Sequence, residues 1–512
     1  MKQVNQFWAD QLVDEILAVR PHEEPYIINS GFTPSGPPHI GTLRDFATVT
    51  AVSRVMNERG IANKVMVFVD DLDPLRTLSG FLDPKIYEPF MFRPLCQIPW
   101  SGTTQTYAEY FAQKTMHLLQ DVLGYQLEPH LTSETYTTGS KPMFQFAQRC
   151  IDQRHAIREF FDEFKHKPHT EFFFLKLQCS TCDRFVTVKQ LDQSTSEVWY
   201  DCVHCGSYEA QTLLVPERMK LGWRVEWAGK WIMYHVDFEP CGKDHGSAGG
   251  SIDTGAGLLE QIFRTNPPVF CVYEFIQTSK TGLMHKSLQL TDTTEHFLVQ
   301  LQQIGPEVLN YHLFAKKPSR HLILDLGEVE ALYDEFDNAV RRFHQDPTTE
   351  RALVLAFEHA PIPKRLFSAR QIIQQLQIYH SPTKVFEKLK QNETLMEDEN
   401  QFLRRRIAAL DLVRQSRSLK HSRGESNITP DRAILLRFME LLRLETTVDP
   451  SAINRIIQTI QLEQDQPRSR IYRTLYQALL HSAHGPPLAT ILPELGIEEI
   501  LRRIEHRCSE ES

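Results

Sequence analysis

The stretch that decides the fold is Gly31-Phe32-Thr33-Pro34-Ser35-Gly36-Pro37-Pro38-His39-Ile40-Gly41. An apolar run precedes it at 26–28 and a helix-like run follows it at 42–47, so we expect a strand, a Gly/Pro-rich turn and a helix. The first N–H groups of a helix have no partner within the helix and, together with the helix dipole, attract phosphate. His39 can add a hydrogen bond there, and Gly41 lets a ligand approach the backbone. The stretch predicts a phosphate site; the alternative is an ordinary turn with a surface histidine.

The composition is that of a globular protein of several domains. The chain has 512 residues, of which 41% are hydrophobic and 24% charged, and about three or four domains are expected. No apolar run reaches the roughly 18 to 20 residues of a membrane helix, and acidic residues within 1–19 favour an amphipathic helix over a signal peptide. The formal charge of −9 argues against a surface that binds nucleic acid all over, but allows one local basic face.

The order of the patterns predicts an α/β protein with a helical C-terminal half. Apolar strands such as 65–69 alternate with helical stretches such as 46–57, which is typical of a parallel sheet covered by helices. The sheet pattern is interrupted near 166 and resumes from about 223 to 290; from 294 onward we expect no strand, but helices such as 331–343, 366–378 and 431–444.

Four of the nine cysteines form a metal-binding pattern. Cys179-x-x-Cys182 and Cys202-x-x-Cys205 are separated by 19 residues, and two such knuckles can place four thiolates around one zinc ion. A complete shell of four cysteines leaves no open position, so the pattern predicts a structural zinc site; four unrelated buried cysteines are the alternative. The other cysteines show no disulfide framework, and we expect a reducing, cytoplasmic setting.

A dense stretch of aromatic, charged and glycine residues follows. It contains Trp223-Arg224-Val225-Glu226-Trp227 and then Val236-Asp237-Phe238-Glu239-Pro240-Cys241-Gly242-Lys243-Asp244-His245. Rigid aromatic walls with a few polar groups are typical of a binding pocket. A charged surface strand and loop is the alternative.

These segments together resemble one enzyme family. The opening stretch resembles the HIGH motif of class I aminoacyl-tRNA synthetases, in the Pro-Ser-Gly-Pro-x-His-Ile-Gly form of the class I lysyl-tRNA synthetases. That family also carries a Trp-Arg-x-Asp-Trp element and a Phe-Glu-Pro-x-Gly-Lys-Asp-His element in this order. The segments 70–76 and 333–337 resemble further strings of the family, and the likeness thins after about residue 380.

The resemblance implies a Rossmann-type catalytic domain interrupted by a zinc-ribbon insertion and followed by helical domains. The expected domains are the first catalytic part at 1–165, the zinc-binding insertion at 166–210, the second catalytic part at 211–300, a helical stem-contact domain at 301–385 and a helical anticodon-binding domain at 386–512. We expect a monomer with no membrane partner.

The resemblance also implies site residues. Those expected at the amino acid are Gly31, Thr33, Trp223, His245 and Tyr273; those expected at ATP are Pro38, His39, Gly41, Thr42, Gly242, Lys243, Asp244 and Met284. A buried lysine ammonium needs a carboxylate or other polar oxygens. Glu226 is one candidate, with Asp71 and Asp73 behind it; the alternative is that Glu226 pairs with Arg224 or Lys230 on the surface. The family usually has aspartate at the position of Glu226.

The loop that should match the KMSKS motif of class I synthetases is altered. It reads Leu283-Met284-His285-Lys286-Ser287, in which Leu283 replaces the first lysine. Leucine cannot stabilise the charge that develops on a departing pyrophosphate, whereas Lys286, with Ser287 as the other retained motif residue, could do so. Lys280 is a second candidate. A plain solvated lysine is the alternative for Lys286.

A basic stretch lies in the helical half. Seven basic residues face a single acidic one, Asp411, within 404–423; they are Arg404, Arg405, Arg406, Arg414, Arg417, Lys420 and Arg423. Such a stretch could follow RNA phosphates, and Phe402, Tyr472 and Tyr476 could stack on bases. A flexible surface loop is the alternative.

The sequence therefore predicts an ATP-dependent lysine–tRNA ligase. His39, Lys286 and Ser287 are the expected catalytic residues, lysine and its tRNA are the substrates, magnesium assists at the phosphates, and zinc is structural. The alternative is a class I paralogue with altered or lost charging activity: one that uses another amino acid, uses another acceptor, or only binds tRNA. Leu283 and Glu226 motivate that alternative.

Overall fold

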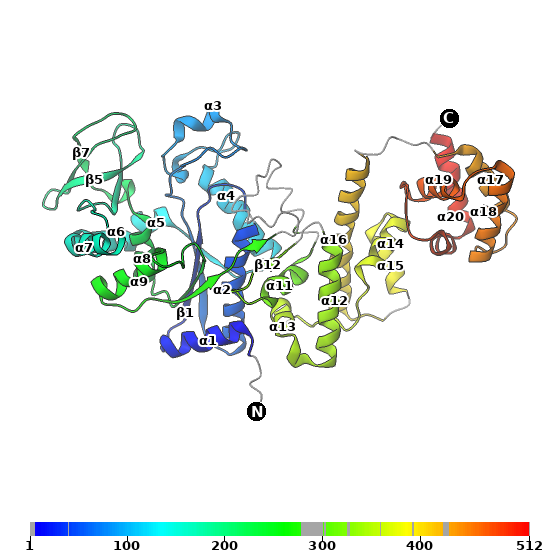
Figure 1. Ribbon diagram of the computed structural model, residues 1–512, viewed down its shortest axis with the longest axis horizontal. Helices are drawn as coiled ribbons and strands as arrows, with labels where there is room; N and C mark the ends of the chain where they lie inside the picture. The colour runs from blue at the N-terminus through cyan, green and yellow to red at the C-terminus, as the bar shows by residue number, and fades with distance from the viewer. Residues whose placement is uncertain are drawn as a thin grey trace. The chain divides into compact units, whose positions relative to one another are not determined.

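The computed structural model describes residues 6–38, 40–277, 301, 304–324, 328–358, 360–391, 394–422 and 430–510 (Figure 1). The predicted residues His39, Met284, Lys286 and Ser287 lie outside these ranges, as do Lys280, Leu283 and Arg423. The chain divides into two compact units: one comprises 1–301, 306–327 and 346–359, and the other comprises 302–305, 328–345 and 360–512.

The first unit is built on a parallel five-stranded sheet with the order β10-β9-β1-β2-β3. The strands are β1 (Tyr26–Phe32), β2 (Asn63–Val69), β3 (Glu128–Leu131), β9 (Phe238–Gly242) and β10 (Val269–Tyr273). On one side of β1 lie β2 and then β3. On its other side lie β9 and then β10. The strand order therefore reverses between β1 and β9, and in open α/β sheets the ligand crevice lies at the carboxyl ends of the strands at such a point.

Helices surround this sheet (Figure 1). They are α1 (Trp8–Val19), α2 (Ile40–Glu58), α3 (Pro84–Tyr87), α4 (Tyr107–Met116), α5 (Thr132–Thr137), α6 (Pro142–Asp152), α7 (Arg154–Lys165), α8 (Trp223–Met233), α9 (Ser251–Gly257), α11 (Pro306–Ala315) and α13 (Arg351–Phe357). Helix α2 directly follows the turn after β1 and buries Leu43, Phe46 and Val49 completely. The predicted strand, turn and helix around residue 39 are confirmed on both sides of that residue.

An antiparallel sheet carries the cysteines. Its order is β7-β6-β5-β4-β8, with β4 (Leu175–Gln178), β5 (Phe185–Asp192), β6 (Glu197–Tyr200), β7 (Ala210–Leu213) and β8 (Met219–Leu221). The inserted sheet extends past the expected boundary at 210, because β8 returns to pair with β4.

Two details differ from the expected pattern. The stretch that begins the second part of the sheet pattern, Trp223–Met233, is helix α8 and not a strand. All residues from Val225 to Trp231 are buried, so polarity does not mark which side of the helix faces inward. A short strand also occurs after residue 294, since β12 (Leu322–Ile323) pairs in parallel with β11 (Ile276–Gln277).

The second unit is helical in its described residues. Its helices are α12 (Val329–Gln345), α14 (Ala369–Tyr379), α15 (Pro382–Lys390), α16 (Glu397–Ser422), α17 (Arg432–Leu442), α18 (Pro450–Gln464), α19 (Arg468–Leu480) and α20 (Leu488–Glu510). These confirm the predicted helices near 331–343, 366–378 and 431–444. Among all the helices of both units that are described, none combines the length and apolar character needed to cross a membrane.

The two compact units do not follow the expected division into domains at 301–385 and 386–512. Helices α11 and α13, from the segment 301–385, belong to the first unit, whereas α12, α14 and α15 belong to the second.

Candidate active site

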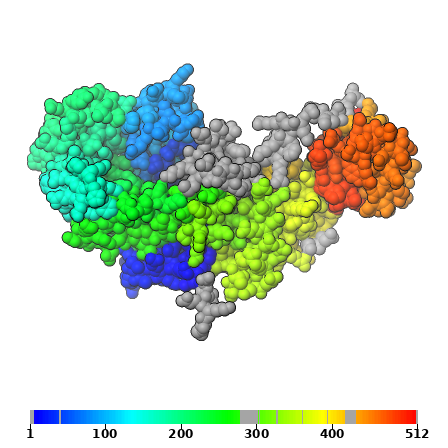
Figure 2. Space-filling view, viewed as in Figure 1, coloured from blue at the N-terminus to red at the C-terminus, as the bar shows by residue number. Residues whose placement is uncertain are grey.

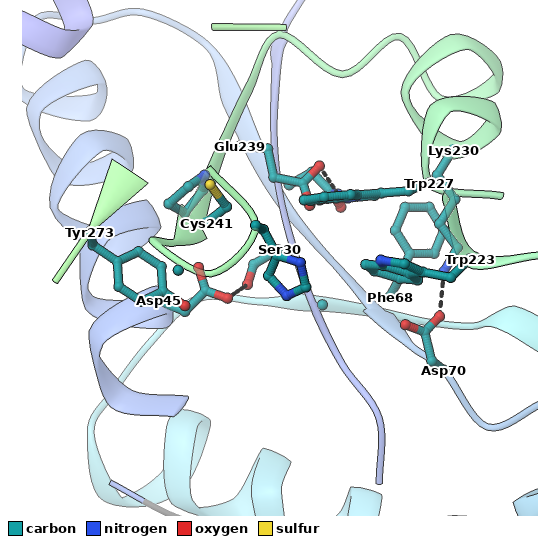
Figure 3. A pocket seen from close by; sticks show the side chains of 15 residues that line it. Ser30, Asp45, Phe68, Asp70, Trp223, Trp227, Lys230, Glu239, Cys241 and Tyr273 are labelled. Atoms are coloured by element: carbon teal, nitrogen blue, oxygen red, sulfur yellow. Dashed lines mark hydrogen bonds and ion pairs between the residues drawn. The ribbon is translucent and has the colours of Figure 1, made fainter. Parts of the chain in front are cut away.

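A cavity of about 180 Å³ lies where the strand order reverses (Figure 3). Its lining comes from the carboxyl ends of β1, β9 and β10 and from helices α2 and α8. The lining residues are Asn29, Ser30, Gly31, Asp45, Phe68, Asp70, Trp223, Trp227, Lys230, Glu239, Pro240, Cys241, Gly242, His245 and Tyr273. Four of the five residues expected at the amino acid are among them, namely Gly31, Trp223, His245 and Tyr273.

The helix α8 supplies an aromatic wall. Its residues Trp223, Trp227 and Trp231 are four apart and therefore lie on one side of the helix. The rings of Trp223 and Trp227 stack with centroids 5.0 Å apart, and those of Trp227 and Trp231 lie 4.9 Å apart. His245 lies 5.6 Å from the ring of Trp227. The helical period thus builds the rigid wall that the sequence predicted.

Glu239 holds this wall to the sheet. Its carboxylate accepts hydrogen bonds from the indole N–H groups of Trp227, at 2.7 Å, and of Trp231. The amide of Asn29 donates a third hydrogen bond at 2.8 Å. Complete burial outweighs these donors and raises the pKa of Glu239 to about 7.

Asp45 is the least satisfied carboxylate of the cavity. It projects from the first turns of α2, and its Oδ2 accepts a hydrogen bond of 3.1 Å from Ser30 Oγ, whereas its buried Oδ1 has no hydrogen-bond partner among the residues that the structure describes. Burial, with a contribution from nearby Glu239, raises the pKa of Asp45 well above its ordinary value. The side-chain oxygen of Asn29 is likewise buried without a partner in the described part of the chain. Two unpaired acceptor oxygens on one cavity favour a ligand with several N–H donors.

On the opposite side of the cavity, a lysine of the chain itself already neutralises the charge of Asp70. The ammonium of Lys230 forms an ion pair with Asp70, donates to Thr132 Oγ1 at 3.1 Å and lies 4.7 Å from the centre of the Phe68 ring. In Figure 3, Asp45 and Tyr273 lie on one side of the cavity, and Asp70, Phe68 and Trp223 lie on the other. The unpaired acceptor oxygens that remain for a ligand, within the described residues, belong to Asp45 and Asn29.

Glu226 does not line the cavity. Its fully buried carboxylate accepts hydrogen bonds from Lys220 Nζ at 2.5 Å and from the Tyr136 hydroxyl at 2.8 Å. The predicted role of Glu226 as the ammonium acceptor is not supported by this geometry, because a lysine of the chain itself occupies that position. Pairing with Arg224 or Lys230 does not occur either, since Arg224 donates to Gly250 O and Thr254 Oγ1.

Thr33 also points away from the cavity and into the ion-pair cluster behind it. Its hydroxyl donates to Asp73 Oδ2 at 2.7 Å, and Asp73 Oδ1 lies 3.2 Å from Lys220 Nζ. Asp71, the other candidate behind Glu226, accepts two hydrogen bonds from Ser133, from its N–H at 2.9 Å and its hydroxyl at 2.5 Å. The structure thus separates a ligand cavity from a buried cluster of ion pairs.

Of the residues predicted to bind ATP, those that the structure describes lie in two segments of the chain. Pro38, Gly41 and Thr42 stand at the start of α2, and Gly242 ends β9. Lys243 Nζ forms an ion pair of 2.6 Å with Glu274, and Asp244 follows it in the same turn. A Cβ on Gly242 would lie 2.6 Å from the carboxylate of Asp244, so a larger residue here would displace that side chain.

The four cysteines form a compact cluster. Their sulfur atoms all lie within 4.8 Å of one another, with 3.7 Å between Cys179 and Cys205 and 3.6 Å between Cys182 and Cys202. A tetrahedral zinc site with Zn–S bonds of about 2.3 Å places its sulfur atoms about 3.8 Å apart. The residues present therefore fit zinc.

The basic stretch is partly internal. Arg406 is buried and forms a bidentate ion pair with Asp337, with both N–O distances 2.7 Å, and Arg414 pairs with Asp411 at 2.7 Å. Phe402 is buried too, so it cannot serve as an exposed stacking surface. The stretch belongs to helix α16 up to Ser422 and is not a loop there. The sequence shows the charges, but not the acidic partner that lies 69 residues away.

Sequence reasoning missed Asp45, Asn29, Lys230 and the role of Glu239. A signal was present for two of them. Asp45 lies four residues after Gly41, on the same side of the new helix. Glu239 is a charged residue within an otherwise apolar strand. Asn29 and Lys230 had no such signal.

Comparison with known proteins gives concordant matches. The profile of the family described as "tRNA synthetases class I (K)" matches residues 6–360. The lysine–tRNA ligase of Methanocaldococcus jannaschii is 28% identical, over 97% of this chain and 99% of the relative. That of Thermoplasma acidophilum is 26% identical over 98% and 99%, and that of Methanosarcina barkeri is 31% identical over 67% and 62%. The range matched by the family profile contains every residue that lines the cavity.

Proposed function

Since this chain belongs to the class I (K) family of tRNA synthetases, we propose that it is an ATP-dependent lysine–tRNA ligase. One observation favours lysine as the amino acid. Asp45 and Asn29 line the same small cavity, and each has a buried oxygen, Oδ1, without a hydrogen-bond partner among the described residues. The cavity is smaller than the roughly 300 Å³ at which sites for drug-sized ligands begin, which suits a single amino acid. The relatives named above as lysine–tRNA ligases support the same assignment.

The ammonium of the substrate binds at Asp45. An ammonium has three N–H donors and no acceptor, so it suits a cavity on which Asp45 and Asn29 both offer acceptor oxygens. Asp70 and Glu226 do not compete for it, because Lys230 and Lys220 already neutralise them. The stacked rings of Trp223 and Trp227 form the apolar wall for the aliphatic part of the side chain.

Activation takes place beside the start of α2. The lysine carboxylate oxygen attacks the α-phosphorus of ATP, a new O–P bond forms, and the bond to the β,γ-diphosphate breaks to release pyrophosphate. The N–H groups at the start of α2 stabilise the phosphate charge. His39 and the residues Gly41, Thr42, Gly242, Lys243 and Asp244 hold the nucleotide. Lys286, Ser287 and Met284 act from the altered loop, and magnesium assists at the phosphates.

Transfer to tRNA completes the reaction. A hydroxyl oxygen of the terminal ribose attacks the carbonyl carbon of lysyl-adenylate, an ester bond forms, AMP leaves, and the hydroxyl proton passes to solvent. Zinc at the four cysteines is structural, because four thiolates complete its shell.

The helical unit is the proposed site of anticodon contact. It contains a cavity of about 270 Å³ between α14–α15 and α19–α20. Its lining carries four permanent cations, Lys384, Arg502, Arg503 and Arg507, against one acid, Glu499. A basic cavity on a helical unit is suited to RNA phosphates.

The test is a panel of all amino acids in ATP–pyrophosphate exchange with tRNA present, followed by charging of lysine tRNA. Lysine-dependent exchange and charging are expected. Silence with lysine, from folded and zinc-loaded protein, would overturn the proposal. Exchange with another amino acid would identify the altered paralogue that Leu283 raises as the alternative, and RNA binding without exchange would identify the form that only binds tRNA.

A further inference from the structure

The charged side chain of the second segment expected at ATP is that of Lys243. This residue directly follows Gly242, which ends β9 and lines the cavity. The N–H group of Lys243 donates to Tyr273 O at 3.1 Å, so the ends of β9 and β10 fix its backbone. The backbone alone does not fix the ammonium, because lysine carries its charge on a flexible four-carbon chain. Other elements of the fold therefore decide where this charge lies.

Glu274 holds the ammonium of Lys243. It directly follows β10, and its Oε2 accepts a hydrogen bond of 2.6 Å from Lys243 Nζ. The ring of Phe275 lies 5.3 Å from the same ammonium. An ammonium has three N–H donors, and within the described residues Glu274 is its one hydrogen-bond acceptor. The side chain of Lys243 is still 37% exposed. The ion pair thus orients the ammonium and leaves donors for an anionic ligand.

The segment after α11 fixes Glu274 in turn. The N–H group of Glu274 donates to Pro318 O at 2.8 Å, and His321 Nδ1 lies 3.4 Å from Glu274 Oε2. Two residues further along the chain, β11 begins and pairs with β12. Figure 2 shows the green surface of the chain up to 277 beside the yellow-green surface of the chain after 306. Both the backbone and the carboxylate of Glu274 are therefore held by this segment.

Arg44 ties the same segment to α2. Its side chain is buried, and its Nη1 donates to Leu313 O in α11 at 2.9 Å. Its Nη2 donates to Lys316 O at 3.1 Å and to Lys317 O at 2.6 Å. Burial lowers the pKa of Arg44 to about 10. Within the described residues no carboxylate pairs with this cation, so carbonyl oxygens at the negative end of α11 stabilise it. Only a guanidinium has the fixed fork of donors that can reach several carbonyl groups at once.

These contacts connect the two segments expected at ATP. We propose that Arg44 and Glu274 are positioning residues that hold the ammonium of Lys243 at a fixed place relative to the start of α2. Neither touches the nucleotide: Arg44 is buried and Glu274 carries the wrong charge for a phosphate, so both act through Lys243. Correct placement matters because small displacements of a group that binds the reacting phosphates slow the reaction. The inference rests on the proposed function, since it takes Lys243 and the start of α2 as two sides of one nucleotide site.

The opposite role for Glu274 is competition with the phosphates for the ammonium of Lys243. The two roles predict effects of opposite sign. If Glu274 positions Lys243, removal of its charge weakens ATP binding, because the freed side chain must be ordered when the ligand binds. If Glu274 competes, removal of its charge strengthens ATP binding.

The experiment is a double-mutant cycle of Glu274→Gln and Lys243→Ala with the full-length, zinc-loaded protein. The dissociation constant of a non-hydrolysable ATP analogue is measured with lysine tRNA present, and thermal unfolding is recorded for each variant. The matched control is Glu171→Gln. Glu171 also forms an ion pair with a basic residue, Arg154, has a histidine, His155, at 3.6 Å and is 34% exposed.

The two single variants should differ in size of effect. Lys243→Ala should weaken binding of the analogue by about tenfold or more, because a charge-assisted contact to phosphate is lost. Glu274→Gln should weaken it by about three- to fivefold. The double variant should bind no more weakly than Lys243→Ala alone, because Glu274 acts through Lys243. The control should bind the analogue as the wild type does.

Arg44→Lys tests the other end of the connection. It keeps the positive charge but loses the fork that contacts Leu313 O together with the carbonyls of 316–317. Binding of the analogue should weaken by about threefold in the wild-type background and should not change in the Lys243→Ala background. If this variant does not fold, the cycle with Glu274 decides alone.

Three outcomes would overturn the inference. They are tighter or unchanged binding of the analogue by Glu274→Gln, an equal loss for Glu274→Gln with and without Lys243, and an equal loss in the Glu171 control. Lysine-dependent pyrophosphate exchange tests the proposed function separately. A protein that shows the coupling between Glu274 and Lys243 but does not exchange with lysine would keep the inference and lose the assignment as a lysine–tRNA ligase.

Discussion

The two cavities on either side of Trp223 differ in size and in the sign of their charge. The smaller one has a volume of about 180 Å³, and in the described residues it keeps an unpaired carboxylate oxygen at Asp45. The larger one, of about 560 Å³, is lined by the partly exposed rings of Phe92 and Trp223 and by Arg76 and Lys176, which form no ion pair within the described residues. The smaller cavity is therefore suited to a cationic ligand and the larger one to an anionic ligand. Trp223, at the start of α8, lines both cavities and lies between two surroundings of opposite charge.

Of the substitutions predicted here, Asp45→Asn should have the largest effect, because it removes the carboxylate from the smaller cavity. Removing one partner of a buried ion pair costs about 3–5 kcal/mol, so we expect kcat/KM for lysine to fall by about 100-fold or more, with the KM for tRNA little changed. The thermal stability of the free protein should hold or rise, because an unpaired buried carboxylate is removed. Steady-state kinetics and thermal unfolding check both parts.

The control for this substitution is Asp121→Asn, at an exposed carboxylate far from the cavity residues in sequence. Equal losses in both variants, or a loss in D45N that accompanies unfolding, would contradict the assignment of the ammonium to Asp45.

Glu226→Gln tests whether the ion-pair cluster stabilises the fold without binding lysine. It removes the charge that faces Lys220 at 2.5 Å, so we expect the melting temperature of the protein to fall by several degrees. The KM for lysine should change less than threefold, because Glu226 does not line the amino-acid cavity. A large rise in this KM at unchanged stability would restore Glu226 as the ammonium acceptor.

The free energy of unfolding should depend on pH through Glu239, a buried carboxylate in the lining of the smaller cavity. Burial raises the pKa of Glu239 from 4.5 to about 7, so the folded protein binds its proton more tightly than the unfolded chain. Its contribution to stability is therefore complete below about pH 4.5 and is lost as pH rises through 7. The complete loss is on the order of 3 kcal/mol.

Thermal unfolding of the free protein between pH 5 and 8 checks this dependence. The wild type should lose stability relative to Glu239→Gln as pH rises across this range. Parallel curves for the two proteins would show that Glu239 does not titrate there.

Loss of the metal should affect the larger cavity alone. We expect Cys205→Ser to lower the zinc content and to raise the KM for tRNA by about tenfold, since the knuckle that carries Val203 and His204 loses its anchor. Binding of a non-hydrolysable lysyl-adenylate analogue, measured by calorimetry, should stay within twofold of the wild type. Metal analysis confirms the first step, and weaker binding of the analogue would show that the two cavities are coupled.

Local patterns predicted much of the fold. The strand–turn–helix around residue 39 and the cysteine spacing depend on neighbouring residues, and the structure shows β1, α2 and a cluster of four sulfur atoms within 4.8 Å. Helix α8 was harder to predict, because nearly every residue from Val225 to Trp231 is buried and the usual contrast between polar and apolar sides is missing.

The partners of charged side chains could not be predicted in this way. Lys230 reaches Asp70 from 160 residues away, and Arg406 reaches Asp337 from 69 residues away. An ion pair within the chain and a carboxylate open to a ligand have the same appearance in sequence, so Glu226 was a candidate and Asp45 was not.

The sequence by itself determined the class of protein, since motifs in a fixed order, spaced cysteines and a helix start are properties of neighbouring residues. Only the tertiary structure showed which carboxylate keeps an unpaired oxygen beside the cavity, among the described residues, and where a second cavity lies. The physical reason is that the cost of burying a charge depends on every group around it. Those groups come from β1, α2, α8 and β9, which only folding brings together.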